Sequence, residues 1–305
     1  MNLPTVKQLR YFVALESHGH FGKAAQACFV SQSAFSVAIR DLERLLEVQL
    51  VDRTNKSVTI TASGREVATR ARDCLREMEE LVMLARSNRD PLAGKLRLGV
   101  IPTIAPFLLP KVLPALRRAY PQLQLYLHED LTQRIYAKLM AGELDLILIA
   151  LPYELRNVEL MGLFDDPFRL ACHEHSKLVD PQHYKVEDLP QESVLLLEDG
   201  HCLREHALSA CEIRKLEQVS GFAASSLLTL VEMVDADLGI TYLPQMAVDS
   251  PLLKSTRIRT YPLAENSVRE IGLAWRRSSA FGEAFRLLGE FIRAHRVKGE
   301  GEARQ

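Results

Sequence analysis

Hydrophobic side chains in the first 46 residues recur every three or four positions, a spacing typical of amphipathic helices. The pattern predicts a helix over residues 5–17, a short helix over 20–27 and a third helix over 32–46. Ser31 precedes the third helix and is a favoured N-cap residue. Because the tight turn 28–30 joins the second and third helices, this order predicts a helix-turn-helix.

The next segment, residues 50–61, has the alternation of a β-hairpin, with Asn55 and Lys56 at its tip. With this hairpin as a wing, residues 1–61 are predicted to form a winged helix-turn-helix domain that binds double-stranded DNA. Polar side chains on the third helix and the wing are the candidates for contacts to phosphates and bases, although they would also suit a solvated surface. They are Ser31, Gln32, Ser33, Ser36 and Arg40 on the helix, and Arg53 and Lys56 on the wing.

A long amphipathic helix is predicted over residues 62–88, and with the hinge that follows we assign residues 62–90 as a linker and dimerisation segment. Its apolar stripe consists of Val67, Ala71, Cys74, Met78, Leu81 and Ala85. A stripe of this length must be buried. It can pair with a second copy of the chain, antiparallel, or pack on its own domain.

Residues 91–305 alternate short apolar strands with helical segments, which favours an α/β domain whose parallel sheet is covered by helices. The predicted strands are 96–100, 123–128, 144–150, 168–173, 193–197, 240–242 and 271–275, and the predicted helices are 107–119, 132–141, 226–236 and 281–294.

One stretch of this domain carries candidate chemistry. After the apolar run that ends at Leu197, Asp199 and Gly200 break the strand, and a helix is predicted to follow with Cys202 in its first turn and Cys211 at its far end. Helix N-termini favour negative charge, so a thiol there ionises more easily. Nine helical residues rise roughly 13 Å, whereas a disulfide tolerates Cα atoms only about 4.4–6.8 Å apart. The two thiols could therefore form a redox switch that unwinds the helix, or be two unrelated buried cysteines.

Composition narrows the classes of protein. The chain has 305 residues, enough for about two domains, and its net charge is −1. Residues 1–76 hold 11 Lys and Arg against 7 Asp and Glu, a mildly basic segment that permits DNA binding. No apolar run is long enough to span a bilayer, and the N-terminus has no secretory h-region. Five cysteines do not form an extracellular disulfide framework, so a reducing cytoplasm is expected.

The N-terminal residues resemble those of LysR-type transcriptional regulators. The resemblance is carried as a set by Leu9-Arg10-Tyr11-Phe12, His20-Phe21, Ala24-Ala25, Ser31-Gln32-Ser33 and Leu50-Val51-Asp52-Arg53. It implies a winged helix-turn-helix, a linker helix, and a two-lobed α/β sensor domain like a periplasmic binding protein. It also implies a homodimer or homotetramer and a regulator without enzymatic activity or cofactor.

Within that family, three stretches resemble the peroxide-sensing branch: 99–110, 126–129 and 196–204. The resemblance implies that hydrogen peroxide oxidises Cys202 to a sulfenic acid and that Cys211 then forms a disulfide with it. It further implies that Thr103, Thr132, His201 and Arg276 surround the peroxide or the sulfur, and that a thiol reductant such as glutaredoxin or thioredoxin reverses the reaction.

The sequence departs from that branch at one place. Some members have His-Phe-Arg where this chain has Gly221-Phe222-Ala223, so any help from those basic groups is missing. The alternative function is a LysR-type regulator that binds a small-molecule effector between the two lobes. Cys172-His173-Glu174-His175 lacks a full ligand set on one face of a strand, and no metal site is predicted.

Overall fold

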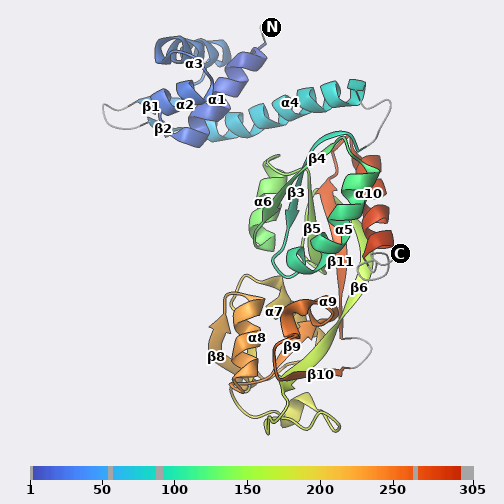
Figure 1. Ribbon diagram of the computed structural model, residues 1–305. Coiled ribbons are helices and arrows are strands. Elements are labelled where there is room, and N and C mark those ends of the chain that lie inside the picture. Colours follow the sequence, from blue (N-terminus) through green and yellow to red (C-terminus); the bar gives the residue numbers. More distant parts are fainter. Residues whose placement is uncertain (1–2, 54–57, 87–91, 264–266, 297–305) are drawn as a thin grey trace. The chain divides into compact units, whose positions relative to one another are not determined.

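The computed structural model describes residues 3–53, 58–86, 92–263 and 267–296. The chain divides into two compact units, Met1–Arg89 and Asp90–Gln305 (Figure 1). Each unit has its own hydrophobic core. The predicted hinge lies at the boundary between the units, mostly outside the described residues.

The N-terminal unit has the predicted helix-turn-helix and wing. Its elements are α1 (Val6–His18), α2 (Phe21–Ala27), α3 (Gln32–Leu46), β1 (Val51–Arg53), β2 (Val58–Ile60) and α4 (Ala62–Arg86). Ser31 caps α3 as predicted, because its hydroxyl accepts a hydrogen bond from the amide of Ala34. Phe35, Ile39 and Leu42 form the buried face of α3 and pack into the core of the unit.

The linker helix α4 is buried over only part of its stripe. Ala68 and Ala71 lie in the buried part, and Arg72 pairs with Glu16 of α1. Cys74 is exposed, and Met78 and Leu81 are 47% and 71% exposed. The N-terminal half of the helix therefore packs on its own domain, and the farther half leaves apolar side chains uncovered within the N-terminal unit.

The C-terminal unit alternates strands and helices as predicted. Its strands are β3 (Gly94–Val100), β4 (Leu123–Glu129), β5 (Leu146–Leu151), β6 (Val158–His173), β7 (Val194–Leu197), β8 (Val219–Ala224), β9 (Thr241–Pro244), β10 (Ile258–Pro262) and β11 (Val268–Arg276). Its α-helices are α5 (Ala105–Ala119), α6 (Thr132–Met140), α7 (Cys202–Ala210), α8 (Leu227–Asp235), α9 (Gln245–Val248) and α10 (Gly282–His295), with 3₁₀ helices at Val186–Asp188, Leu216–Gln218 and Pro251–Leu253.

The long strand β6 joins two lobes (Figure 1). Its first part, residues 158–167, pairs antiparallel with β11 in the first lobe, next to β5, β3 and β4. Its second part, residues 168–173, pairs with β9 and β10 in the second lobe. β7 and β8 form a separate parallel pair. The two-lobed α/β architecture agrees with the prediction, although the sheet is mixed rather than wholly parallel.

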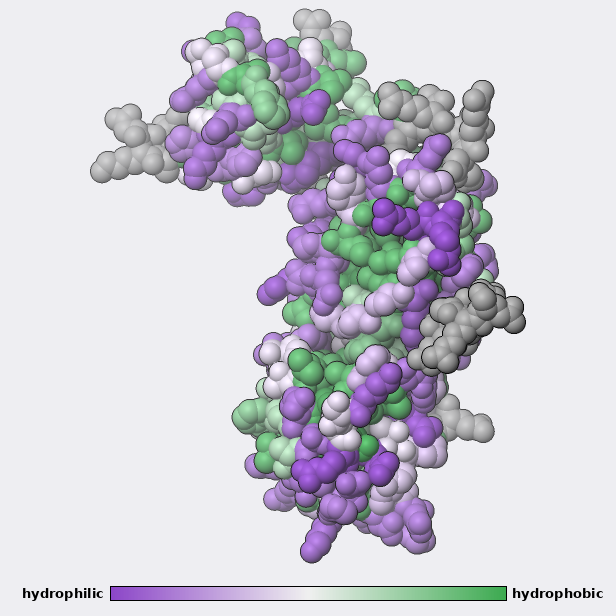
Figure 2. All heavy atoms as spheres, viewed as in Figure 1, coloured by the Kyte–Doolittle hydropathy of each residue, from purple (hydrophilic) through white to green (hydrophobic). Residues whose placement is uncertain are grey.

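Apolar side chains fill the space between the strands and the covering helices. On the face drawn in Figure 2, hydrophobic groups show in both lobes between rims of hydrophilic side chains. β5 is buried along its whole length, as expected of a central strand covered on both faces. Among the residues described, no helix combines the length and apolar character needed to cross a lipid bilayer.

Candidate functional site

Cys202 is the first residue of α7, directly after the turn that ends β7. Gly200 makes this turn with φ of 96°, a conformation that a side chain would strain. His201 is the N-cap residue, but its side chain makes no capping hydrogen bond. Leu203 and Ala207 bury one face of the helix and hold its N-terminus, with the thiol, inside the unit.

The thiol lines a cavity of about 10 Å³, the space that one water molecule needs. Three segments meet there: the loop after β3, the residues that begin α6, and the turn before α7. The lining residues are Ile101, Pro102, Thr103, Leu131, Thr132, Gly200, His201 and Cys202. The structure therefore brings Thr103, Thr132, His201 and Cys202 together, as the sequence analysis expected.

Arg269 holds Thr103 in place. Its guanidinium donates to the Thr103 hydroxyl and to the Thr103 carbonyl oxygen, each at 3.0 Å. The other side of the guanidinium donates to Oδ2 of Asp166 at 2.9 and 3.0 Å. All three residues are buried. With its hydroxyl oxygen already accepting from Arg269, Thr103 can turn its own O–H toward the cavity.

Thr132 contributes the second hydroxyl and is also buried. No described residue offers Thr132 Oγ1 a hydrogen-bond partner of ordinary geometry. The hydroxyl nevertheless interacts with the Cys202 thiol and lowers its pKa. A buried hydroxyl without a regular partner is costly, and it leaves hydrogen-bonding capacity for a small polar molecule in the cavity.

Burial dominates the ionisation of Cys202. Removal from water raises the pKa of the thiol, while the Thr132 hydroxyl and the positive charge of Arg269 pull that pKa down. Glu205, one turn along α7, acts in the same direction as burial. The resting side chain is therefore a thiol near neutral pH, and the expected benefit of the helix terminus does not overcome desolvation.

His201 lines the cavity without adding a positive charge to it. Burial lowers the pKa of its imidazole, so the ring is neutral at pH 7. His206, on the inner face of α7, is neutral for the same reason. Its Nε2 donates to the carbonyl oxygen of Pro152 at 2.9 Å and ties α7 to the chain beyond β5.

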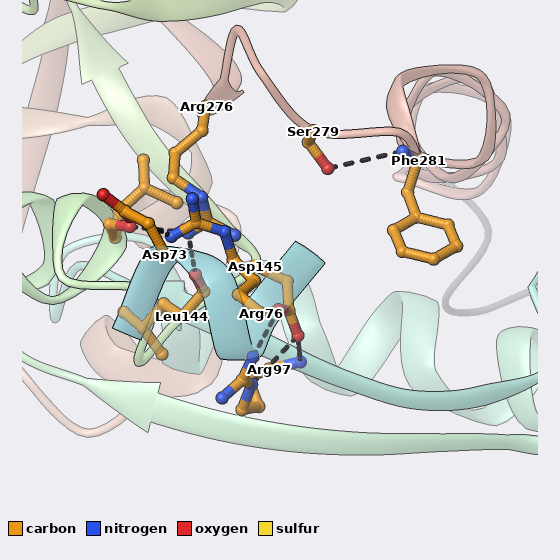
Figure 3. Close-up of polar contacts among 9 residues, drawn as sticks. Asp73, Arg76, Arg97, Leu144, Asp145, Arg276, Ser279 and Phe281 are labelled. Carbon is orange, nitrogen blue, oxygen red and sulfur yellow. Dashed lines mark hydrogen bonds and ion pairs between the residues drawn. The ribbon is translucent and has the colours of Figure 1, made fainter. Parts of the chain in front are cut away.

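Arg276 also lies elsewhere than expected. Its guanidinium donates to the carbonyl oxygens of Leu139 and Leu144, at the end of α6, and Figure 3 shows it directed toward Leu144. The cation that acts on the Cys202 thiol is Arg269. Both arginines are on β11, but only the sheet pairing reveals which end of that strand reaches the cavity.

Cys211 caps the C-terminus of α7 and is 8% exposed. Burial raises the pKa of its thiol to about 12. The negative charge of a Cys211 thiolate would raise the pKa values of Tyr184 and Tyr242. The hydroxyls of these two tyrosines hydrogen-bond each other at 2.6 Å. Cys202 and Cys211 are both free thiols, and the nine-residue helix sets their Cα atoms roughly 13 Å apart.

The DNA-contact candidates of α3 are accessible. Ser31, Gln32, Ser33 and Arg40 are exposed, and Ser36 is half-buried. Ser31 and Ser33 share a hydrogen bond of 3.1 Å between their hydroxyl oxygens. Arg53 ends β1, and Lys56 lies outside the described residues.

Asp166 and Arg269 are the site residues that the sequence analysis missed. The sequence offers little signal for them, because Asp166 follows Asp165 in β6 and Arg269 precedes Glu270 in β11, so charge alone does not single them out. In the part of the chain that the structure describes, no cluster of three or more His, Cys, Asp or Glu side chains is placed to hold a metal ion.

Two family models match the chain. The helix-turn-helix model of the bacterial regulatory lysR family covers residues 6–65, and the LysR substrate binding domain covers residues 89–296. The chain therefore belongs to the LysR family of DNA-binding transcriptional regulators.

Among curated relatives, the chain is 38% identical to the dual regulator OxyR of Escherichia coli, over 95% of both chains. It is 39% identical to the regulator EstR of Acinetobacter baylyi, over 95% of this chain and 97% of the other. Among solved structures, a full-length OxyR variant from Pseudomonas aeruginosa is 34% identical, with a TM-score of 0.75 over 95% of this chain and 98% of that one. A mutant of Corynebacterium glutamicum OxyR in an H2O2-bound form is 30% identical, with a TM-score of 0.65 over 96% and 93%. The chain is thus homologous to OxyR.

Proposed function

We propose that this protein is a hydrogen-peroxide-sensing transcriptional regulator whose sensor is Cys202. Peroxide occupies the cavity and the sulfur attacks one of its oxygens. An S–O bond forms as the O–O bond breaks, and the thiol proton ends on the departing oxygen. The products are a cysteine sulfenic acid and water, so the sulfur is oxidised and the peroxide is reduced.

The observation that carries this proposal is a buried thiol on a water-sized cavity with two threonine hydroxyls, Thr103 and Thr132. Hydrogen peroxide is only slightly larger than water and needs both donors and acceptors. A hydroxyl supplies either role. Because the resting sulfur holds its proton, Arg269 and Thr132 have a second task, to stabilise the thiolate as it forms.

The second step joins the two cysteines. The Cys211 thiol attacks the sulfenic sulfur, an S–S bond forms, and the sulfenic oxygen departs as water with the proton of the thiol. The helix between the two residues must unwind first, since its length exceeds the reach of a disulfide. A dithiol reductant such as glutaredoxin or thioredoxin then returns both thiols while it is itself oxidised to a disulfide.

Unwinding of α7 is the structural signal in this proposal. The helix is tied to the first lobe through His206 and Pro152, so its loss changes how the two lobes pack. A homodimer or homotetramer, assembled in part through α4, would pass that change to DNA-binding units that contact an operator through α3 and the wing. The cytoplasm, where reductants keep resting thiols reduced, suits such a cycle. Gly221 and Ala223 on β8 supply no basic group to the oxidised form.

The alternative is a regulator that binds a larger effector between the lobes. The cavity at Thr103 is too small for a metabolite of several heavy atoms unless the lobes move apart. This volume favours peroxide.

The decisive test is mass spectrometry of each cysteine after a sub-stoichiometric peroxide pulse, combined with DNA footprinting. Cys202 should be oxidised first and Cys211 should join it in a disulfide. Cys202→Ser should abolish the response, and Cys211→Ser should stop at the sulfenic acid. Cys172→Ser, a buried thiol on β6, is the matched control. A normal DNA response to peroxide in the Cys202→Ser protein would refute the proposal.

A further inference from the structure

Asp166 and Arg269 form an ion pair that water hardly reaches. The side chains are 2% and 0% exposed. Oδ2 of Asp166 accepts from Nε and Nη2 of Arg269, and Oδ1 accepts from the backbone amide of Met246 at 3.0 Å. Both oxygens of the carboxylate are therefore occupied. Burial raises the pKa of Asp166, and the charge of Arg269 with the hydrogen bonds from Met246 and Arg269 opposes that rise.

The guanidinium has two neighbours of different kinds. One side faces the carboxylate, and the other faces Thr103 in the wall of the cavity. A buried ion pair is expensive to assemble and is poor evidence for stability in itself. Its place between the cavity and α9 points to a role in the chemistry of the thiol.

We propose that Asp166 limits the reactivity of Cys202: its charge and its two hydrogen bonds from Arg269 restrain how strongly that guanidinium stabilises the Cys202 thiolate. This inference rests on the proposed function and deepens it. Asp166 does not touch the reacting atoms and is a positioning residue. Through Oδ1 it also links the guanidinium to the first residues of α9 in the second lobe.

Other groups also influence the ionisation of Cys202 and Asp166, and the test must keep them in place. The pKa of Cys202 is raised by Glu205 and lowered by Thr132 and Arg269. A charge on Cys202 raises the pKa of Tyr153 in turn. Neutral His201 lines the cavity beside the thiol. Asp249 is the further acidic group that acts on Asp166. A change at Asp166 alone keeps the residue types at all of these positions, so the titration reports how Arg269 acts on the thiolate once its ion-pair partner is gone.

The test is a pH titration of the Cys202 thiolate in the full-length protein, followed as the ultraviolet absorbance difference between each variant and its Cys202→Ser counterpart. Asp166→Asn keeps the shape and one acceptor but removes the charge. We expect the midpoint to fall by about one pH unit and the thiolate fraction near neutral pH to rise roughly tenfold. Asp165→Asn changes the charge at an exposed neighbouring position of β6 and should leave the midpoint unchanged.

An Asp166→Asn midpoint that equals that of Asp165→Asn, or that rises, would overturn the inference. If Asp166→Asn does not fold, the double variant Asp166→Asn/Arg269→Gln decides, because it leaves no unpaired charge. A midpoint that rises by less than about half a pH unit above that of the parent, or falls, supports charge balance, and a larger rise contradicts it. The titration needs no peroxide, so an inert Cys202 would refute the proposed function and leave this measurement intact.

Discussion

Arg269 and Thr103 share two hydrogen bonds of 3.0 Å, although 166 positions separate them in the sequence. One bond ends on the hydroxyl and the other on the carbonyl oxygen of the same threonine. This pair fixes the loop after β3 against β11 and holds the Thr103 hydroxyl in the cavity that Cys202 also lines.

Thr103→Val removes that hydroxyl while keeping the shape of the side chain. The buried guanidinium loses an acceptor, so the free energy of unfolding should fall by about 1–3 kcal/mol. The loss of a polar group at the cavity should slow oxidation of Cys202 by peroxide at least about tenfold. Denaturant unfolding and stopped-flow oxidation measure the two effects. If the variant reacts at the parent rate, Thr103 has no role in the oxidation of Cys202.

Thr132→Val should separate the effect on stability from the effect on the rate of Cys202 oxidation. Since Thr132 Oγ1 has no regular partner among the described residues, its removal should leave stability unchanged or slightly higher. The pKa of Cys202 loses a lowering influence, and oxidation by peroxide should be slower. Measured side by side with Thr103→Val, this variant should lose rate without losing stability. A loss of stability of about 2 kcal/mol or more would show that the hydroxyl has a structural partner.

His206→Leu tests the tie that holds α7. The variant leaves the carbonyl oxygen of Pro152 without its donor and loosens the helix. Formation of the sulfenic acid should keep its rate, and closure of the disulfide should accelerate several-fold, as measured by rapid alkylation and mass spectrometry. Ser209→Ala, at an exposed position of the same helix, should not accelerate closure, because alanine favours the helix. Equal closure rates in both variants would mean that helix opening does not limit the reaction.

Cys211 should make the protein less stable at alkaline pH. Its pKa is raised from 9.0 to about 12, so the unfolded chain releases this proton above pH 9 while the folded chain keeps it. The contribution is fully present below pH 9 and is lost as pH rises toward about 12. Cys211→Ser should therefore lose less stability than the parent over this range. Thermal unfolding of both proteins over this pH range checks the prediction.

Arg276→Gln should act on the fold rather than on the thiol. The carbonyl oxygens of Leu139 and Leu144 lose their buried donor, at a cost of about 2–4 kcal/mol. The titration midpoint of Cys202 should stay where it is, whereas Arg269→Gln should raise it. A shift of that midpoint in the Arg276 variant would show that Arg276 acts on the Cys202 sulfur after all.

The sequence predicts best what short-range patterns control. The helix-turn-helix follows from helical periodicity and from the Ser31 cap, and the position of Cys202 at the start of α7 follows from the turn at Gly200. These features depend on residues within a few positions of one another, so tertiary contacts do not need to be known.

The missed features depend on distant partners. The sequence predicts only the last part of β6, because Asp165, Asp166 and Pro167 interrupt the apolar pattern of the strand. The segment is nevertheless one continuous strand. It pairs with β11 before and through that interruption, and with β9 and β10 after it. The resemblance implies Arg276, whereas the structure joins Arg269 to Thr103. Both arginines lie on β11, and only the pairing of that strand shows which of them meets Thr103.

The size of the cavity beside Cys202 has a consequence for selectivity. If peroxide reacts in this cavity as proposed, a space of about 10 Å³ disfavours an oxidant that carries an alkyl chain, because its walls would have to move. Discrimination between hydrogen peroxide and organic hydroperoxides then needs no recognition group at all. It follows from molecular volume, and each methylene group on the oxidant requires the walls around the sulfur to open further.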